Sequence, residues 1–164
     1  MFLHNTKMMY TVRVEPVDRS RGALEIILPL VAGGFPFAFL LFPVNRDLVP
    51  TREKAMVLFA AMTLFTGLTI WGMVTLRKAF SVTVEARTLV TGGPYRLVRH
   101  PIYTGEVLTA AMVVILRFSP ANAVLFAVFI ALQLVRSRLE ETKLLRVFPG
   151  YRDTVGKSFW FWKA

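Results

Sequence analysis

The chain has 164 residues, of which 55% are hydrophobic and only 18% charged, and its mean hydropathy is +0.54. Ordinary soluble domains carry about 25% charged residues, so this composition argues against a soluble fold. The sequence contains no cysteine and two histidines, which excludes a disulfide framework, a thiolate nucleophile and a cysteine-ligated zinc site, and we expect no metal.

Uncharged stretches predict an all-α integral membrane protein with about four transmembrane helices. Residues 26–45 and 55–76 contain no charged side chain, and each is long enough for a helix to cross a bilayer core of about 30 Å. Residues 102–116, which contain one charge at Glu106, and residues 118–135 are shorter. Backbone groups in lipid must bond to one another, which favours helices over loops or open strands.

In chain order we expect a single membrane domain, 1–164. Gly33, Gly34 and Pro36 should kink the first span. The last helix should run without interruption from Pro120 to Val147 and project beyond the membrane, until FPG (148–150) ends it. The expected segments are a leader (1–22), two spans (23–44 and 55–76), a loop (77–101) with a β-rich piece SVTVEARTLVT, a helical hairpin (102–135), and a projecting helix with its tail (136–164).

The placement of basic residues predicts the orientation. Of the 20 lysines and arginines, 16 lie in residues 1–22, 77–101 and 136–164, which four spans would place on one side. Positively charged loops stay cytoplasmic, so both termini and the loop 77–101 should be cytoplasmic. The net charge of +10 is therefore explained by the membrane, and no nucleic acid partner is expected.

Charged residues on the projecting helix form pairs at helical spacing. Arg136 and Glu140 share a face that Lys143 continues, and Arg138 with Glu141 forms a second pair. Taken alone, this pattern favours a solvated helix with surface ion pairs.

Two further polar residues stand in or near the apolar segments. A lone loop histidine such as His100 is more often structural than catalytic. Glu106 lies about one turn into an otherwise apolar helix, where an ionisable side chain is a functional candidate by default.

One block of sequence resembles a known family. The segment GGPYRLVRHPIYTGEVL (92–108), followed by R-S-R-L-E-E and F-P-G-Y, resembles the isoprenylcysteine carboxyl methyltransferases and is similar to the related phosphatidylethanolamine N-methyltransferases. The resemblance covers about residues 77–152. It implies a small membrane enzyme that transfers a methyl group from S-adenosyl-L-methionine to a lipid-like acceptor, without a soluble dinucleotide-binding domain. No G-x-G-x-x-G occurs in the chain.

The resemblance also implies the site residues, with 77–101 as the cytoplasmic cofactor loop. Arg136 and Glu140 match the catalytic arginine and glutamate. Carboxylates suit the amine and sulfonium of S-adenosylmethionine, and Arg99 with His100 suits its carboxylate. The implied cofactor-binding residues are Tyr95, Leu97, Val98, Arg99, His100, Pro101, Tyr103, Gly105, Glu140 and Glu141.

The acceptor stays open between a prenylcysteine-type carboxylate and a lipid amine, either one entering from the bilayer. A carboxylate needs only a cation such as Arg136 to hold it, whereas an amine needs a carboxylate to take its proton. The chain departs from the family at its end: Thr154 replaces a second tyrosine, and SFWFWKA (158–164) replaces a proline-containing terminus. We expect the aromatic residues 159–162 to lie among lipid headgroups.

Two other functions remain as alternatives. Membrane sterol reductases share a similar C-terminal architecture, but the phosphates of NADPH call for more clustered basic residues than Arg96 and Arg99. A non-enzymatic membrane scaffold would leave the 92–108 block unexplained. Small residues in the second span permit oligomerisation without requiring it, so the oligomeric state is open.

Overall fold

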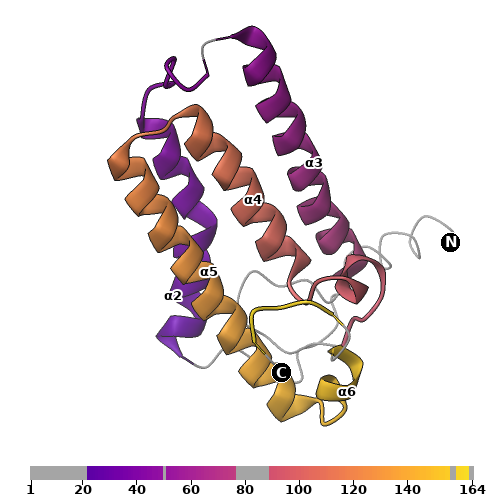
Figure 1. The fold of residues 1–164 in the computed structure, drawn as a ribbon. Coiled ribbons are helices and arrows are strands. Elements are labelled where there is room, and N and C mark those ends of the chain that lie inside the picture. The colour runs from indigo at the N-terminus through magenta and orange to yellow at the C-terminus, as the bar shows by residue number, and fades with distance from the viewer. Residues whose placement is uncertain (1–21, 50, 77–88, 156–157, 163–164) are drawn as a thin grey trace, which may run out of the picture.

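The structure is a computed structural model that describes residues 22–49, 51–76, 89–155 and 158–162 (Figure 1). The leader 1–21 and most of the predicted β-rich piece, up to residue 88, lie outside the described residues. Within the described part the chain is helical and has no strand, which confirms the predicted all-α class. The elements are α2 (Ala23–Gly34), the 3-10 helix η1 (Phe35–Leu41), α3 (Arg52–Leu76), the 3-10 helix η3 (Gly93–Arg96), α4 (Pro101–Leu116), α5 (Pro120–Val147) and α6 (Tyr151–Val155).

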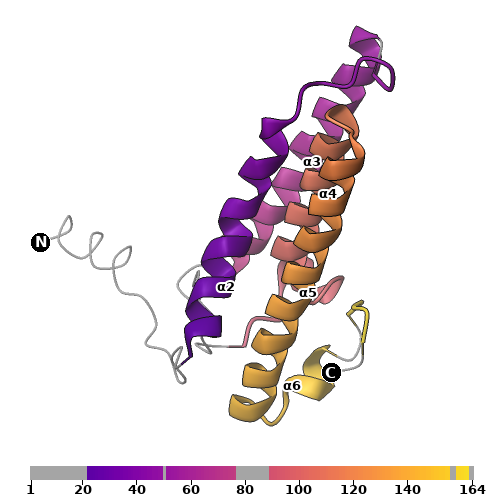
Figure 2. The same ribbon diagram turned by 90° about the vertical axis from the view of Figure 1, so that its left-hand side faces the viewer.

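The long helices form one elongated bundle (Figures 1 and 2). In the view of Figure 1 the chain runs upward through α2 and η1, downward through α3, upward through α4 and downward through α5. The lower half of α5 extends past the other helices and leads into α6. The end of the bundle that carries α6 is called the lower end.

Three segments are long and apolar enough to cross a membrane: Ala23–Leu41, Arg52–Leu76 and Pro120–Val147. The helix α4 has 16 residues, which gives about 24 Å at 1.5 Å per residue, and is shorter than a usual span. Large apolar side chains such as Leu41 and Leu64 point outward, 84% and 70% exposed, as lipid-facing residues do. The integral membrane prediction is confirmed, whereas four complete spans and a cytoplasmic projecting helix stay predictions.

The predicted interruption of the first span occurs as a change of helix type. The α-helical pattern ends at Gly34 and a 3-10 helix continues to Leu41, with Pro36 in its first turn. Proline lacks the N–H that an α-helix would need at this point, so the tighter 3-10 turn takes over.

Aromatic residues hold this first segment against the α4–α5 hairpin. Phe39 and Phe129 are fully buried, with ring centroids 5.8 Å apart in an edge-to-face arrangement. Phe35 stacks on Phe129 at 6.0 Å, and Ala110 and Val114 of α4 complete the cluster. Such aromatic pairs stabilise the packing beyond the area that they bury.

Glycines let α3 and α4 approach closely near the lower end. A Cβ atom at Gly105 would lie 2.8 Å from the Phe65 carbonyl oxygen and 2.9 Å from the Thr69 nitrogen. At Gly72 it would lie 2.8 Å from the Ile102 side chain. Small residues permit this backbone approach in membrane helices, and the contact fixes where α4 begins.

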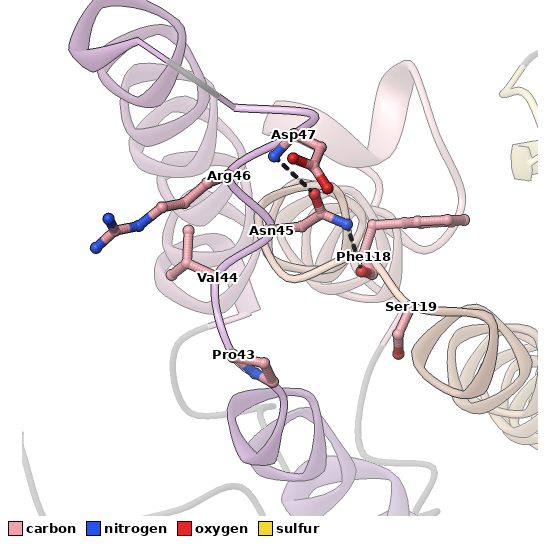
Figure 3. A pocket seen from close by; sticks show the side chains of 7 residues that line it. All are labelled: Pro43, Val44, Asn45, Arg46, Asp47, Phe118 and Ser119. Atoms are coloured by element: carbon pink, nitrogen blue, oxygen red, sulfur yellow. Dashed lines mark hydrogen bonds between the residues drawn. The ribbon is translucent and has the colours of Figure 1, made fainter.

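The upper end carries an open pocket of about 400 Å³ between the 43–47 loop and the α4–α5 turn (Figure 3). Asn45 organises it: its side-chain amide donates to the Phe118 carbonyl at 3.0 Å, and its side-chain oxygen accepts from the Asp47 nitrogen at 3.0 Å. Arg117 ties the same turn to the Phe42 carbonyl at 2.5 Å. These bonds are structural, and the pocket lies at the opposite end of the bundle from α6.

Candidate functional site

The polar site forms at the lower end, where three segments meet. The segment 97–100 leads into α4, and the tail 158–162 lies beside it through a parallel bridge between Val98 and Phe159. Phe159 donates its N–H to the Leu97 carbonyl at 2.9 Å, and Arg99 donates to the Phe159 carbonyl at 3.2 Å. The lower half of α5 supplies the third side. A positive φ of 57° at Gly93, which glycine adopts without strain, starts the turn that precedes this segment.

Glu141 is the centre of the site. It is 0% exposed, and its carboxylate accepts from Arg99 Nη1 at 3.1 Å and lies 3.2 Å from His100 Nε2. The indole N–H of Trp162 donates to its other oxygen. A buried carboxylate is tolerated only when it is paired and hydrogen-bonded in this way.

The neighbouring carboxylate, Glu140, faces the other side of the same imidazole. Its Oε2 accepts from the Tyr103 hydroxyl at 2.7 Å and lies 3.6 Å from His100 Nδ1. Burial by itself would lower the pKa of His100, but hydrogen bonds to Glu140 and Glu141, together with their charges, raise it above its ordinary value. The imidazolium form, which donates from both nitrogens, therefore suits this position.

Tyr103 connects the imidazole to Arg136. Its ring stacks on His100 with centroids 5.4 Å apart and an angle of 7°. The Arg136 guanidinium lies 4.6 Å from the centre of the Tyr103 ring, within the range of a cation–π contact. Burial, followed by the charge of Glu140, raises the pKa of Tyr95, so this phenol stays neutral.

The tail contributes two tryptophans that the family resemblance did not include among the site residues. The Trp160 ring lies 4.7 Å from that of His100, and the Trp162 ring lies 5.4 Å from the Arg138 guanidinium. Phe159 and Phe161 are 64% and 69% exposed. The two tryptophans therefore turn toward the site, and the headgroup position of the tail stays a prediction. The F-W-F-W alternation was the available signal, because alternate residues of an extended segment face opposite sides.

The structure brings together seven of the residues implied by the resemblance: Tyr95, Arg99, His100, Tyr103, Arg136, Glu140 and Glu141. Three others lie differently. Leu97 is 67% exposed, Pro101 packs against Gly72, and Gly105 packs against α3. Val98 contributes to the site through its backbone, which forms the bridge to the tail.

One of the two ion pairs expected along α5, that of Arg138 with Glu141, is replaced by contacts to other segments, whereas the charge of Arg136 still acts on Glu140. Glu141 pairs with Arg99 and His100 instead of Arg138. Lys143 lies 2.7 Å from Glu25, near the start of α2. Arg136 and Lys143 are buried, so the interpretation of this helix as a solvated one is wrong. In the described part of the chain, no three histidine, aspartate or glutamate side chains are grouped to hold a metal.

A bundle of apolar helices with a buried glutamate, histidine and arginine cluster at one end defines a helical membrane protein with a polar site at that end. The model of the isoprenylcysteine carboxyl methyltransferase (ICMT) family matches residues 55–146. This match covers more than half of the 164 residues, and the chain belongs to that family. It confirms the predicted family of membrane methyltransferases. No curated protein and no solved structure matches the chain.

Proposed function

We propose that the chain transfers a methyl group from S-adenosyl-L-methionine to a lipid-like acceptor at the lower end of the bundle. The observation that carries the proposal is the pair of adjacent carboxylates, Glu140 and Glu141, which face opposite nitrogens of one buried imidazole. Together with Arg99, they present both signs of charge within one enclosed site.

The residues present fit the cofactor. Glu140 and Glu141 match its ammonium and sulfonium, and Arg99 and His100 match its carboxylate. Two polar atoms in the site, Arg99 Nε and Trp160 Nε1, are buried without a hydrogen-bond partner. A polar ligand would satisfy such donors, whose burial otherwise costs free energy.

When bound, the cofactor supplies a methyl group on a sulfonium, ready for in-line displacement. The work of the chain is then alignment and the exclusion of water. Tyr103 and Trp160 enclose the imidazole with their rings. Arg136 lies over the Tyr103 ring, where it would hold a carboxylate acceptor, whereas an amine acceptor would need a nearby carboxylate to take its proton.

We further propose that the lower end faces the cytoplasm and that the acceptor enters from the bilayer. The charge bias supports this orientation, because most lysines and arginines belong to the segments 1–22, 77–101 and 136–164. The exposed apolar faces of α2, α3 and α5 support lateral entry, since they place lipid directly beside the bundle.

Calorimetry of the detergent-purified chain tests this function. S-adenosylhomocysteine, the product of the methyl donor, should bind saturably, and NADPH should not. Binding of NADPH alone would make the chain a reductase, and binding of neither would favour a scaffold.

Variants locate the site in the same assay. Glu140→Gln and His100→Ala should each weaken S-adenosylhomocysteine binding, while Glu53→Gln, an exposed carboxylate in the first turn of α3, should leave it unchanged. Arg136→Ala should lower turnover more than cofactor affinity. The opposite pattern would indicate that Arg136 contacts the cofactor.

A further inference from the structure

A second polar pair lies between α4 and α5, next to the site on the side toward the membrane interior. Gln133 donates its side-chain amide to the Glu106 carboxylate at 2.5 Å. Glu106 lies three residues after Tyr103, and Gln133 lies three residues before Arg136. Each is therefore about one helical turn from the contact between Tyr103 and Arg136.

This pair carries one buried hydrogen-bond acceptor that no described residue uses. Gln133 turns its amide nitrogen toward Glu106, which suits a carboxylate that accepts hydrogen bonds. That orientation leaves Gln133 Oε1 on the other side, buried and without a partner, on a residue that is 2% exposed. An unpaired buried carbonyl oxygen is unfavourable, and a ligand that brings an N–H group would satisfy it.

The charges around the pair favour the same kind of ligand. The negative charges of Glu106 and Glu140 and the positive charge of Arg136 all act on the Tyr103 hydroxyl, and Arg136 also acts on Glu106. A carboxylate acceptor placed here would face two carboxylates of like charge. An amine would instead meet acceptors, and the nearby guanidinium of Arg136 would favour its uncharged, nucleophilic form.

We propose that Glu106 and Gln133 form the subsite for the acceptor headgroup, that this headgroup is a lipid amine with at least one N–H, and that Glu106 takes its proton. This inference rests on the proposed function and selects among its acceptors. The amine nitrogen forms a bond to the methyl carbon as the carbon–sulfur bond breaks, and the electron pair of that bond stays on sulfur. The displaced proton passes from nitrogen to the Glu106 carboxylate.

Binding without the methyl donor gives the first test. The probes are lysophosphatidylethanolamine and its N-acetylated derivative, which share chain and phosphate and differ in the amine, titrated into the detergent-purified full chain. The free amine should bind at least about tenfold more tightly, as expected for about 1.4 kcal/mol of added interaction. Glu106→Gln and Gln133→Met should each reduce this preference to within about twofold.

Turnover gives the second test, with radiolabelled S-adenosylmethionine and either phosphatidylethanolamine vesicles or a prenylcysteine carboxylate. The amine should be methylated, and Glu106→Gln should lower kcat by about 100-fold or more, as for loss of a general base. Glu106→Asp should recover part of that loss. S-adenosylhomocysteine affinity should be unchanged in both variants, which separates proton transfer from damage to the cofactor site.

Thr109→Val is the matched control, because it removes a polar group from α4 one turn beyond Glu106, where Thr109 lies 3.4 Å from Thr66. It should keep both the binding preference and the turnover. Methylation of the carboxylate without the amine, at saturating methyl donor, would overturn the subsite and leave the proposed function intact. Failure to bind any methyl donor would overturn the proposed function, and equal affinity for the two lysolipids would overturn the subsite independently.

Discussion

Trp162 donates its indole N–H to Glu141, the same carboxylate that Arg99 and His100 contact from the opposite side. The tail therefore completes the site by supplying a hydrogen-bond donor where the cofactor amine is proposed to bind. Its backbone bridge at Val98 fixes this position, because the tail cannot move without breaking the bonds to segment 97–99.

Replacement of Trp162 by phenylalanine tests this relationship. Glu141 would lose one donor while the aromatic ring is retained, so we expect the unliganded chain to lose about 1–3 kcal/mol of stability. S-adenosylhomocysteine should bind more tightly, because its ammonium supplies the missing donor. Thermal unfolding with and without the ligand measures both effects. Phe161→Leu, at an exposed position of the same segment, is the control, and a variant with parental stability and affinity would contradict the assignment.

The pKa of His100 should lie above the ordinary histidine value of about 6.5, because Glu140 and Glu141 raise it despite the burial of the side chain. A raised folded-state pKa contributes stability that is fully present below the unfolded-state pKa and is lost as pH rises through the folded-state value. The chain should therefore become less stable from neutral to alkaline pH.

NMR of histidine-labelled protein measures this directly, because the chain has only two histidines. His4→Gln leaves His100 as the single signal. The melting temperature of a His100→Gln variant should lose the alkaline dependence that the parent shows. A His100 signal that titrates below the ordinary range would contradict the assigned pair of carboxylates.

The helices and the family could be predicted from the sequence, because long uncharged runs and an ordered motif block are local patterns. The long helix after Pro120 is one example, since no glycine or proline interrupts it before Val147. The partners of Glu141 could not be predicted in this way. Helical spacing offers Arg138 on the same helix, whereas Arg99 and His100 come from 42 and 41 positions away. The buried environment that makes these partners necessary exists only after folding.

The role of Gly105 also could not be predicted from the sequence. The motif block places it beside Tyr103, but a glycine has no side chain whose chemistry would indicate a direction. The structure turns it toward Phe65 and Thr69 of α3. Its motif position therefore reflects helix packing that fixes the start of α4, which in turn positions His100 and Tyr103 within the site.

Gly105→Ala should consequently destabilise the chain. The added Cβ would lie 2.8 Å from the Phe65 carbonyl oxygen and 2.9 Å from the Thr69 nitrogen. Because these are backbone atoms, α3 and α4 must separate, and such overpacking typically costs about 1–3 kcal/mol. Gly67→Ala is the matched control, with no atom within 4 Å of the added Cβ. Equal melting temperatures for the two variants would show that the close approach of α3 and α4 does not contribute to stability.

The salt bridge between Lys143 and Glu25 should hold the lower half of α5 in place. The two charged atoms lie 2.7 Å apart, and the side chains are only 5% and 24% exposed. Lys143→Gln should cost about 1.5–3 kcal/mol, the usual contribution of a hydrogen bond to a charged group. Because Glu140 and Glu141 are on the same stretch of helix, S-adenosylhomocysteine affinity should fall several-fold as well.

A double-mutant cycle separates the pair from its surroundings. If Lys143 and Glu25 act together, the variant that combines Lys143→Gln with Glu25→Gln should be less destabilised than the sum of the two single changes. Arg146→Gln, at an exposed position in the last turn of α5, controls for loss of a positive charge from this end and should leave stability and affinity unchanged. Strict additivity in the cycle would mean that the two residues stabilise the chain through separate contacts, and that the start of α2 does not position the site.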